Sequence, residues 1–176
     1  MSLREKINQN STVAAVVAVV VLAIVLLIIV WPGGPSGPGG ASGQYFFDLT
    51  TNEPFVAPID ALPPIDSPSG GKDMGVRAVY MTCGGCGEDE RFLGWLERYT
   101  PQAKQLYLKT VEDNKSRENQ MAPGQVVAQS LPNGVEMRGP DGGPWISRRS
   151  PQAKQIMEKA YATCGGQPTK NCEPAR

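Results

Sequence analysis

Four cysteines are the residues whose type and spacing most directly suggest chemistry in this chain. Cys83 and Cys86 are separated by two glycines, and Cys164 and Cys172 follow near the carboxyl end. Thiolates bind metal ions or attack disulfides, and pairs of thiols oxidise to disulfides. Three arrangements are therefore open: two structural disulfides, one structural zinc ion with all four cysteines as ligands, or a redox pair formed by Cys83 and Cys86.

The run Cys83-Gly-Gly-Cys86-Gly87 resembles the zinc knuckle of zinc-ribbon and rubredoxin-like proteins. In those knuckles glycine permits the backbone turns that aim both sulfurs at one ion. The resemblance implies zinc as the cofactor, but it covers only this run, since the spacing of Cys164 and Cys172 does not form a second knuckle. We expect an oxidising compartment for this domain, and such a compartment favours two disulfides.

An apolar strand followed by Cys-x-x-Cys also resembles the thioredoxin motif, which implies a membrane-tethered thiol-disulfide oxidoreductase that uses Cys83 and Cys86. Glu88, Asp89 and Glu90 follow Cys86 directly. Negative charges disfavour a thiolate, whereas catalytic cysteines need positive surroundings. We therefore expect the cysteines to be structural and the protein not to be an enzyme.

Composition excludes several other kinds of chemistry. The chain has no histidine, which removes Ser-His-Asp and Cys-His catalysis and every histidine-ligated metal site. Its formal net charge is zero, with 17 basic and 17 acidic residues, so no basic surface for nucleic acid is indicated. No cofactor other than zinc is suggested by the residues.

Two segments fifty positions apart are nearly identical. The segments that begin at Trp95 and Trp145 share Trp, Arg, Pro, Gln, Ala, Lys and Gln in register. Such self-similarity predicts a repeated structural unit, here over 95–111 and 145–161. Besides a role in the core, the paired side chains of both copies are candidates for contact with a partner: Trp95, Trp145, Arg98 and Arg148.

Each copy of the repeat predicts a strand followed by a capped helix. Thr100 and Ser150 are suitable N-caps, because a hydroxyl can accept from an unpaired amide of the first helical turn. Pro101 and Pro151 then stand at the first helical position, where a missing N–H costs little. We expect both tryptophans to occupy related places on the sheet and both helices to pack an apolar face onto it.

The chain has an apolar segment before these features. Every residue from Val13 to Trp31 is apolar, and about 19 residues at 1.5 Å each can span a bilayer core. We expect a single-pass transmembrane helix at 13–31 that is retained as a signal anchor, because the apolar region of a cleaved signal peptide is shorter. Basic residues precede it, at Arg4 and Lys6, and none follows before Lys72, which places 1–12 in the cytoplasm and the rest outside.

The remainder divides into short segments and one larger domain. A Gly/Pro linker at 32–43 is a mobile tether, 44–56 is an expected β-hairpin that docks on the domain or on a partner, and 57–73 is a second, Pro-rich linker. The domain at 74–176 is expected to be α+β, with an antiparallel sheet that includes strands near 125–129 and 135–138, two helices and the four-cysteine staple.

Together these features predict a membrane-anchored extracytoplasmic protein, periplasmic in a bacterium, that serves as a non-catalytic accessory or interaction subunit. The expected partners are the membrane and a protein or membrane complex. The alternative from a different class is the thiol-disulfide oxidoreductase described above.

The expected topology can be tested with a protease. Added to intact spheroplasts or oriented vesicles, it should remove the domain that follows Gly43 from the outside, because the basic residues hold the short N-terminal flank in the cytoplasm. Immunoblotting of the C-terminal fragment measures the cleavage. Protection of the domain until the membrane is lysed would show the opposite orientation.

Overall fold

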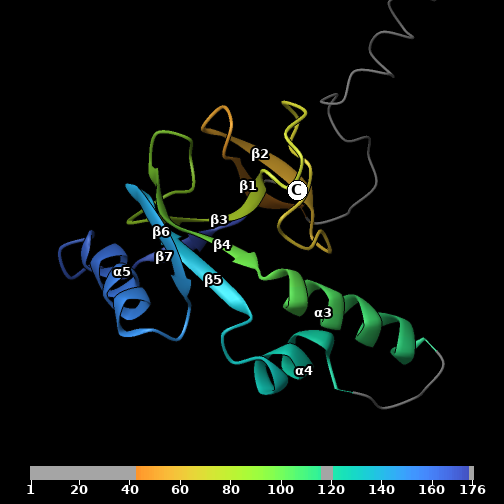
Figure 1. Ribbon diagram of the computed structural model, residues 1–176. Coiled ribbons are helices and arrows are strands. Elements are labelled where there is room, and N and C mark those ends of the chain that lie inside the picture. The colour runs from red at the N-terminus through yellow and green to blue at the C-terminus, as the bar shows by residue number, and fades with distance from the viewer. Residues whose placement is uncertain (1–42, 116–120, 175–176) are drawn as a thin grey trace, which may run out of the picture. The chain divides into compact units, whose positions relative to one another are not determined.

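The computed structural model of the chain describes residues 43–115 and 121–174 (Figure 1). These residues belong to one compact unit. The predicted transmembrane helix at 13–31, the N-terminal flank 1–12 and nearly all of the linker 32–43 lie outside the described residues. Among the residues that are described, no helix is both long and apolar enough to cross a membrane.

The strands of the described chain form one antiparallel sheet. Its six main strands are ordered β2-β1-β3-β4-β5-β6, and the short strand β7 pairs with β3. The bounds are β1 Gly43–Asp48, β2 Glu53–Pro58, β3 Gly75–Thr82, β4 Arg91–Tyr99, β5 Val135–Gly139, β6 Gly142–Ser147 and β7 Lys170–Cys172. Three described helices, α3 Pro101–Asn114, α4 Pro123–Ser130 and α5 Pro151–Ala162, accompany it, so the fold is α+β as expected.

The hairpin expected at 44–56 is present and is part of this sheet. β1 and β2 pair antiparallel across the turn at 49–52, where Asn52 has φ of 60°. β1 also pairs with β3, and Phe47 lies opposite Val76. The hairpin therefore docks on its own domain and adds two strands to the sheet.

Residues 125–129 form a helix, not the expected strand. Pro123 opens α4 at its first turn, where a proline is tolerated, and Val127 is the buried residue of the helix. The run Gln125-Val-Val-Ala-Gln is too short for periodicity to separate strand from helix. The domain thus has a third helix, and the turn at Asn133 and Gly134 connects α4 to β5 instead of joining two strands.

The repeat is confirmed where each helix begins. Thr100 and Ser150 are extended N-caps whose hydroxyls accept from the amides of Ala103 and Ala153, at 3.3 and 3.1 Å. A proline opens each helix, and both alanines are fully buried. The local sequence therefore produces the same cap twice.

The two copies differ in the sheet face that each side chain occupies. Glu97 lies opposite Met137, and Met137 lies opposite Ile146, so these three residues share one face. By the repeat, however, Ile146 corresponds to Leu96. The copies are one residue out of step, and because side chains alternate along a strand, Trp95 and Trp145 lie on opposite faces, contrary to the expected equivalence.

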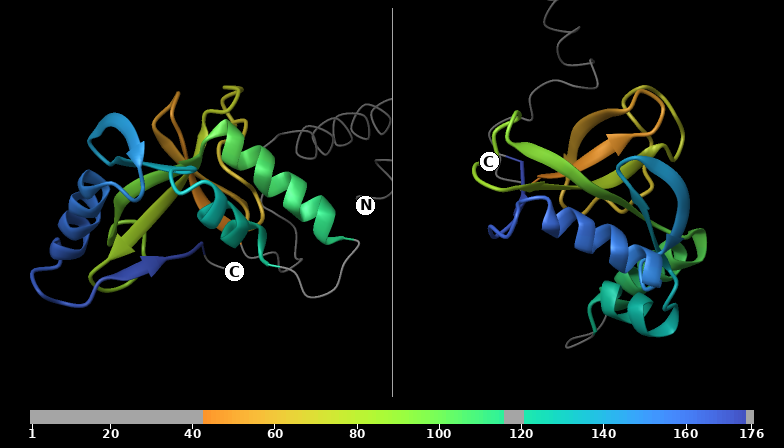
Figure 2. Two further views of the ribbon diagram at one scale, coloured as in Figure 1. Left: turned by 60° about the horizontal axis from the view of Figure 1, so that its bottom comes forward. Right: turned by 90° about the vertical axis from the view of Figure 1, so that its left-hand side faces the viewer.

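The helices also differ. α5 packs on β4, β5 and β6, whereas α3 packs mainly on α4 and the pair extends away from the sheet (Figure 1, Figure 2). Ala103 is the buried residue of α3, and Val111 on its expected core face is 37% exposed. The expectation that both helices pack an apolar face onto the sheet holds for α5 and is wrong for most of α3.

Two hydrophobic clusters lie on the two faces of the sheet. The cluster that we call the Met81 cluster contains Trp95 and Met137 together with Ala153 and Ala160 of α5. The other, the Val76 cluster, is made of Val76, Ala78, Tyr80, Leu96 and Cys172, with Trp145 packed against it. No described helix contributes a residue to the Val76 cluster.

The caps allow a test of the repeated unit. Thr100→Ala and Ser150→Ala should each lower the free energy of unfolding by about 1 kcal/mol, because each removes the acceptor for a helix N-terminal amide. Thermal or urea unfolding followed by tryptophan fluorescence measures the change. Thr163→Ala, at the other end of α5, serves as the control and should change stability by less than about 0.5 kcal/mol. Equal effects of all three variants would contradict the capping role.

Candidate functional site

The four cysteines form two disulfides, Cys83–Cys164 and Cys86–Cys172, with Cα–Cα distances of 5.4 and 5.5 Å. Cys83 and Cys86 lie in the loop between β3 and β4, Cys164 follows α5, and Cys172 lies in β7. The loop is thereby joined to the C-terminal segment, as one of the three alternatives predicts. The zinc alternative is not supported, because all four sulfurs are bonded in pairs and no group of metal-binding side chains is found among the described residues.

The two cysteines of the Cys-x-x-Cys run do not bond to each other. Each is bonded to a cysteine more than 80 residues away in the chain. Thr82, which is fully buried, organises their loop: its hydroxyl accepts from the Gly84 amide and lies 3.0 Å from the Glu90 carbonyl. The arrangement is that of a structural staple that joins distant parts of the domain.

The four Trp and Arg residues singled out from the repeat do not form one site. They form two crossed contacts, one on each face of the sheet. The Arg98 guanidinium of the first copy lies 4.3 Å from the centre of the Trp145 ring in the second copy. Arg148 of the second copy contacts Glu97, which in turn accepts a hydrogen bond from the Trp95 indole of the first. Each contact thus links the two copies.

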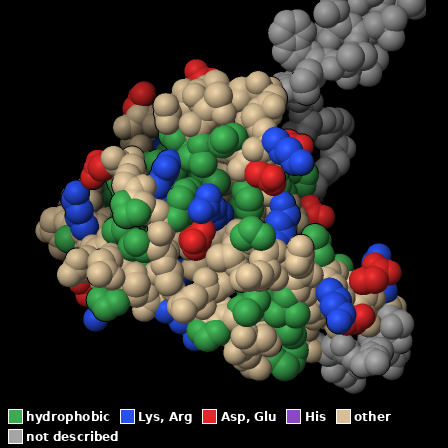
Figure 3. All heavy atoms as spheres, viewed as in Figure 1, with side chains coloured by type: hydrophobic (Ala, Val, Ile, Leu, Met, Phe, Trp, Pro, Cys, Tyr) green, Lys and Arg blue, Asp and Glu red, His purple; other side chains and the backbone are tan. Residues whose placement is uncertain are grey.

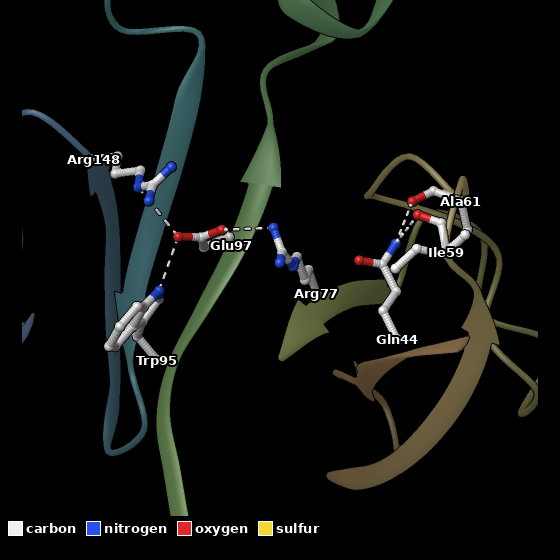
Figure 4. A network of polar contacts seen from close by, with 7 residues as sticks. All are labelled: Gln44, Ile59, Ala61, Arg77, Trp95, Glu97 and Arg148. Carbon is white, nitrogen blue, oxygen red and sulfur yellow. Dashed lines mark hydrogen bonds and ion pairs between the residues drawn. The ribbon is translucent and has the colours of Figure 1, made fainter. Parts of the chain in front are cut away.

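Glu97 is the centre of the contact on the α5 side of the sheet (Figure 4). Its side chain is 7% exposed, and one oxygen accepts from Trp95 Nε1 at 2.9 Å. Arg148 Nε lies 3.3 Å from that oxygen, and Arg77 Nη1 lies 3.6 Å from the other. Burial of a carboxylate is unfavourable without such partners, so the two arginines compensate for the burial of the Glu97 charge.

Sequence reasoning did not identify Glu97 or Arg77. The available signal was a charged residue within an otherwise apolar strand, one position from Leu96 and two from Trp95. Strand alternation places Glu97 on the same face as Trp95. Because a tryptophan in a strand is usually buried, that face is expected to be the inner one. Its arginine partners come from β3 and from the segment after β6, and only the sheet brings these together.

A pocket of about 160 Å³ lies beside Glu97. Its walls include Arg77, Arg148, Tyr99 and the loop at 59–63. Gln44 fixes that loop to β1, since its side-chain amide donates to the carbonyls of Ile59 and Ala61 at 3.1 and 2.9 Å, as Figure 4 shows.

Tyr99 forms another wall of this pocket and packs edge to face against Tyr107 of α3. Burial raises the pKa of the Tyr99 hydroxyl, and the neighbouring Tyr107 and Glu97 raise it further. Tyr99 therefore remains a neutral hydrogen-bonding group at physiological pH.

The opposite face of the sheet carries a second group of stacked arginines. Arg98 and Arg138 lie 4.3 and 5.1 Å from the centre of the Trp145 ring, and Arg98 also pairs with Glu136 at 2.8 Å. Arg91 lies 4.7 Å from the centre of the Tyr45 ring and donates to the Tyr45 hydroxyl at 2.7 Å. We call these residues, with Tyr80, the arginine–aromatic face: Tyr45, Tyr80, Arg91, Arg98, Arg138 and Trp145.

Burial shifts the pKa values of two residues of this face. Burial lowers the pKa of Arg138, and the positive charge of Arg98 lowers it further. Burial raises the pKa of Tyr80, and Arg91 opposes that increase. Arg138 forms no ion pair with any carboxylate of the described residues, and its buried Nε has no hydrogen-bond partner there. The face therefore carries a guanidinium that lacks an acidic partner within the described chain.

No protein-family model matches this chain, and no curated protein or solved structure matches it.

The disulfides make a prediction about stability. Cys172→Ser should lower the free energy of unfolding by about 3 kcal/mol in the loop-entropy model, because with Cys83–Cys164 intact the lost bond closes only the short loop made of 83–86 and 164–172. The double variant Cys86→Ser with Cys172→Ser should lose as much, which separates loss of the bond from the effect of a free thiol. Melting temperatures of the variants test this, and alkylation of the native, unreduced protein should label no cysteine. Four reactive thiols would contradict both disulfides.

Proposed function

We propose that this chain is a membrane-anchored extracytoplasmic protein that binds a protein partner through the arginine–aromatic face and performs no catalysis itself. The observation that carries the proposal is the stacking of three arginines on three aromatic rings, on a sheet face to whose core no described helix contributes a residue.

The composition of this face supports a binding role. Trp, Tyr and Arg are the residues enriched among those that dominate the free energy of protein association. Tyr45, Arg91, Arg98, Arg138 and Trp145 are half-buried, so each is held in place and still has surface available to a partner. Figure 3 shows hydrophobic side chains interspersed with Lys, Arg, Asp and Glu side chains at the surface over the region of β1, β3 and β4.

The unpaired charge of Arg138 supports a partner with acidic groups. Arg98 is already paired with Glu136 at 2.8 Å, and Arg91 lies 3.9 Å from Glu88. Arg138 has no such partner in the described chain. A partner carboxylate beside Trp145 would supply one, and a guanidinium that is oriented by stacking loses little freedom when it binds.

The disulfides support the proposed location. Structural disulfides persist in oxidising compartments such as the periplasm, the endoplasmic reticulum lumen and the cell exterior. This agrees with the orientation that the charges flanking the apolar segment predict. The oxidoreductase alternative receives no such support, because Cys83 and Cys86 are each bonded to a distant cysteine.

The proposal is tested by purifying the full-length protein from its own membrane in mild detergent and quantifying the proteins that accompany it. Arg138→Gln and Trp145→Ala should each reduce a specific partner at least about tenfold, as expected for central interface residues. Arg149→Gln is the matched control, because Arg149 is exposed and donates to the Ala128 carbonyl away from this face.

Two outcomes would contradict the proposal. In one, folded Arg138→Gln and Trp145→Ala proteins retain every partner of the unmodified protein. In the other, Arg149→Gln loses the same partner to the same extent, which would indicate a nonspecific effect of positive charge. Circular dichroism and the melting temperature verify that each variant is folded.

A further inference from the structure

We propose that the pocket beside Glu97 binds a carboxylate group, presented by the C-terminus of a peptide or by a small carboxylic acid. The pocket lies beside Glu97, and Arg98 is the one residue that it shares with the arginine–aromatic face. The inference does not depend on the function proposed above.

Two arginines share the single carboxylate of Glu97. One guanidinium is sufficient to neutralise Glu97, and the pocket contains both Arg77 and Arg148 in contact with it. Arg98 also lines the pocket but is paired with Glu136. Asp60 adds one carboxylate to the rim, is exposed, and forms no ion pair within the described residues. Arg77 and Arg148 thus carry one charge more than Glu97, and the exposed Asp60 offsets that charge from the rim, so the attraction for a further anion depends on the donors that Arg77 and Arg148 leave free.

Arg77 and Arg148 keep N–H donors that Glu97 does not use. Each guanidinium has five N–H donors, and each makes one long contact with Glu97 instead of a bidentate pair near 2.8 Å. The Arg77 and Arg148 side chains are 49% and 51% exposed, so their other donors are accessible from the pocket or solvent. Glu97 is held from within the protein by the Trp95 indole and positions both arginines.

The volume of the pocket limits the size of the ligand. A volume of 160 Å³ corresponds to about five water molecules at roughly 30 Å³ each, well below the 300 Å³ at which pockets for larger ligands begin. It suits one terminal residue or a short acid. Leu62 and Val135 provide apolar lining for the aliphatic part of such a ligand, and Gln44 holds the loop that carries Leu62 in place (Figure 4).

The experiment uses the ¹⁵N-labelled full-length protein in detergent micelles or nanodiscs and follows the assigned Trp95 indole resonance, which reports on Glu97. Three probes are added: the tripeptide N-acetyl-Ala-Ala-Leu with a free C-terminus, the same peptide as its amide, and propionate. We expect saturable shifts with the free-acid peptide or with propionate, and at least tenfold weaker binding of the amide. Tighter binding of the peptide identifies a C-terminus as the source of the carboxylate, and equal binding of propionate identifies a small acid.

Variants separate the pocket from general charge effects. Arg77→Gln and Arg148→Gln should each weaken binding at least tenfold, because a hydrogen bond to a charged group is lost. Arg149→Gln, which removes the same charge at an exposed residue outside the pocket lining, should leave the affinity unchanged. Asp60→Asn keeps both arginines and removes a nearby negative charge, so it should tighten binding roughly twofold to fivefold. If an arginine variant fails to fold, Asp60→Asn still tests whether charge at the pocket controls binding of the carboxylate.

Several results would overturn the inference. The first is equal binding of the amide and the free acid. The second is no saturable shift with either acid up to about 10 mM. The third is an unchanged or weaker affinity in folded Asp60→Asn protein, or equal losses in Arg77→Gln and Arg149→Gln. Failure of the carboxylate experiment leaves the partner experiment unaffected, because the residues whose loss should weaken binding and the readouts differ between the two.

Discussion

The register in which β5 joins β4 to β6 decides which side chains each face of the sheet carries. Met137 lies opposite both Glu97 and Ile146, so the second copy of the repeat is displaced by one residue from the first. A displacement of one residue exchanges the faces of a strand. Trp95 is consequently buried under α5, and Trp145 lies on the face of the Val76 cluster, where two arginines stack on it.

This register also accounts for the buried carboxylate. Glu97 shares its face with Trp95 and Met137, so its charge is held where solvent has little access. Burial of an ion is costly unless partners compensate for it. Arg77 lies directly opposite Glu97 on β3, and Arg148 reaches it from the segment after β6. The polar network and the pocket beside it therefore follow from one strand pairing, and the proposed carboxylate site rests on the arginines that this burial requires.

The disulfides fix the other end of the sheet. They tie the loop between β3 and β4 to the segment after α5 and to β7. Because β7 pairs with β3 beside the stretch that β1 occupies, the C-terminal segment completes the sheet instead of extending from it. Domains of this size bury a limited apolar core, and covalent links of this kind offset the deficit.

Features that depend on a few adjacent residues were determined by the sequence itself. The N-caps at Thr100 and Ser150, the helices that begin at the following prolines and the hairpin of β1 and β2 were predicted, because capping and turn formation act over a few positions. The cysteine run also restricted its chemistry to three alternatives.

Tertiary structure decided the rest. The short apolar run at 125–129 became α4, because a few residues do not distinguish the two periodicities. Which cysteines pair, which face holds each tryptophan, and which arginines reach Glu97 all depend on pairing between residues far apart in the chain. The register depends on how two strands pair, and that pairing assigned Trp145 to the face of the Val76 cluster and Glu97 to the face of Trp95.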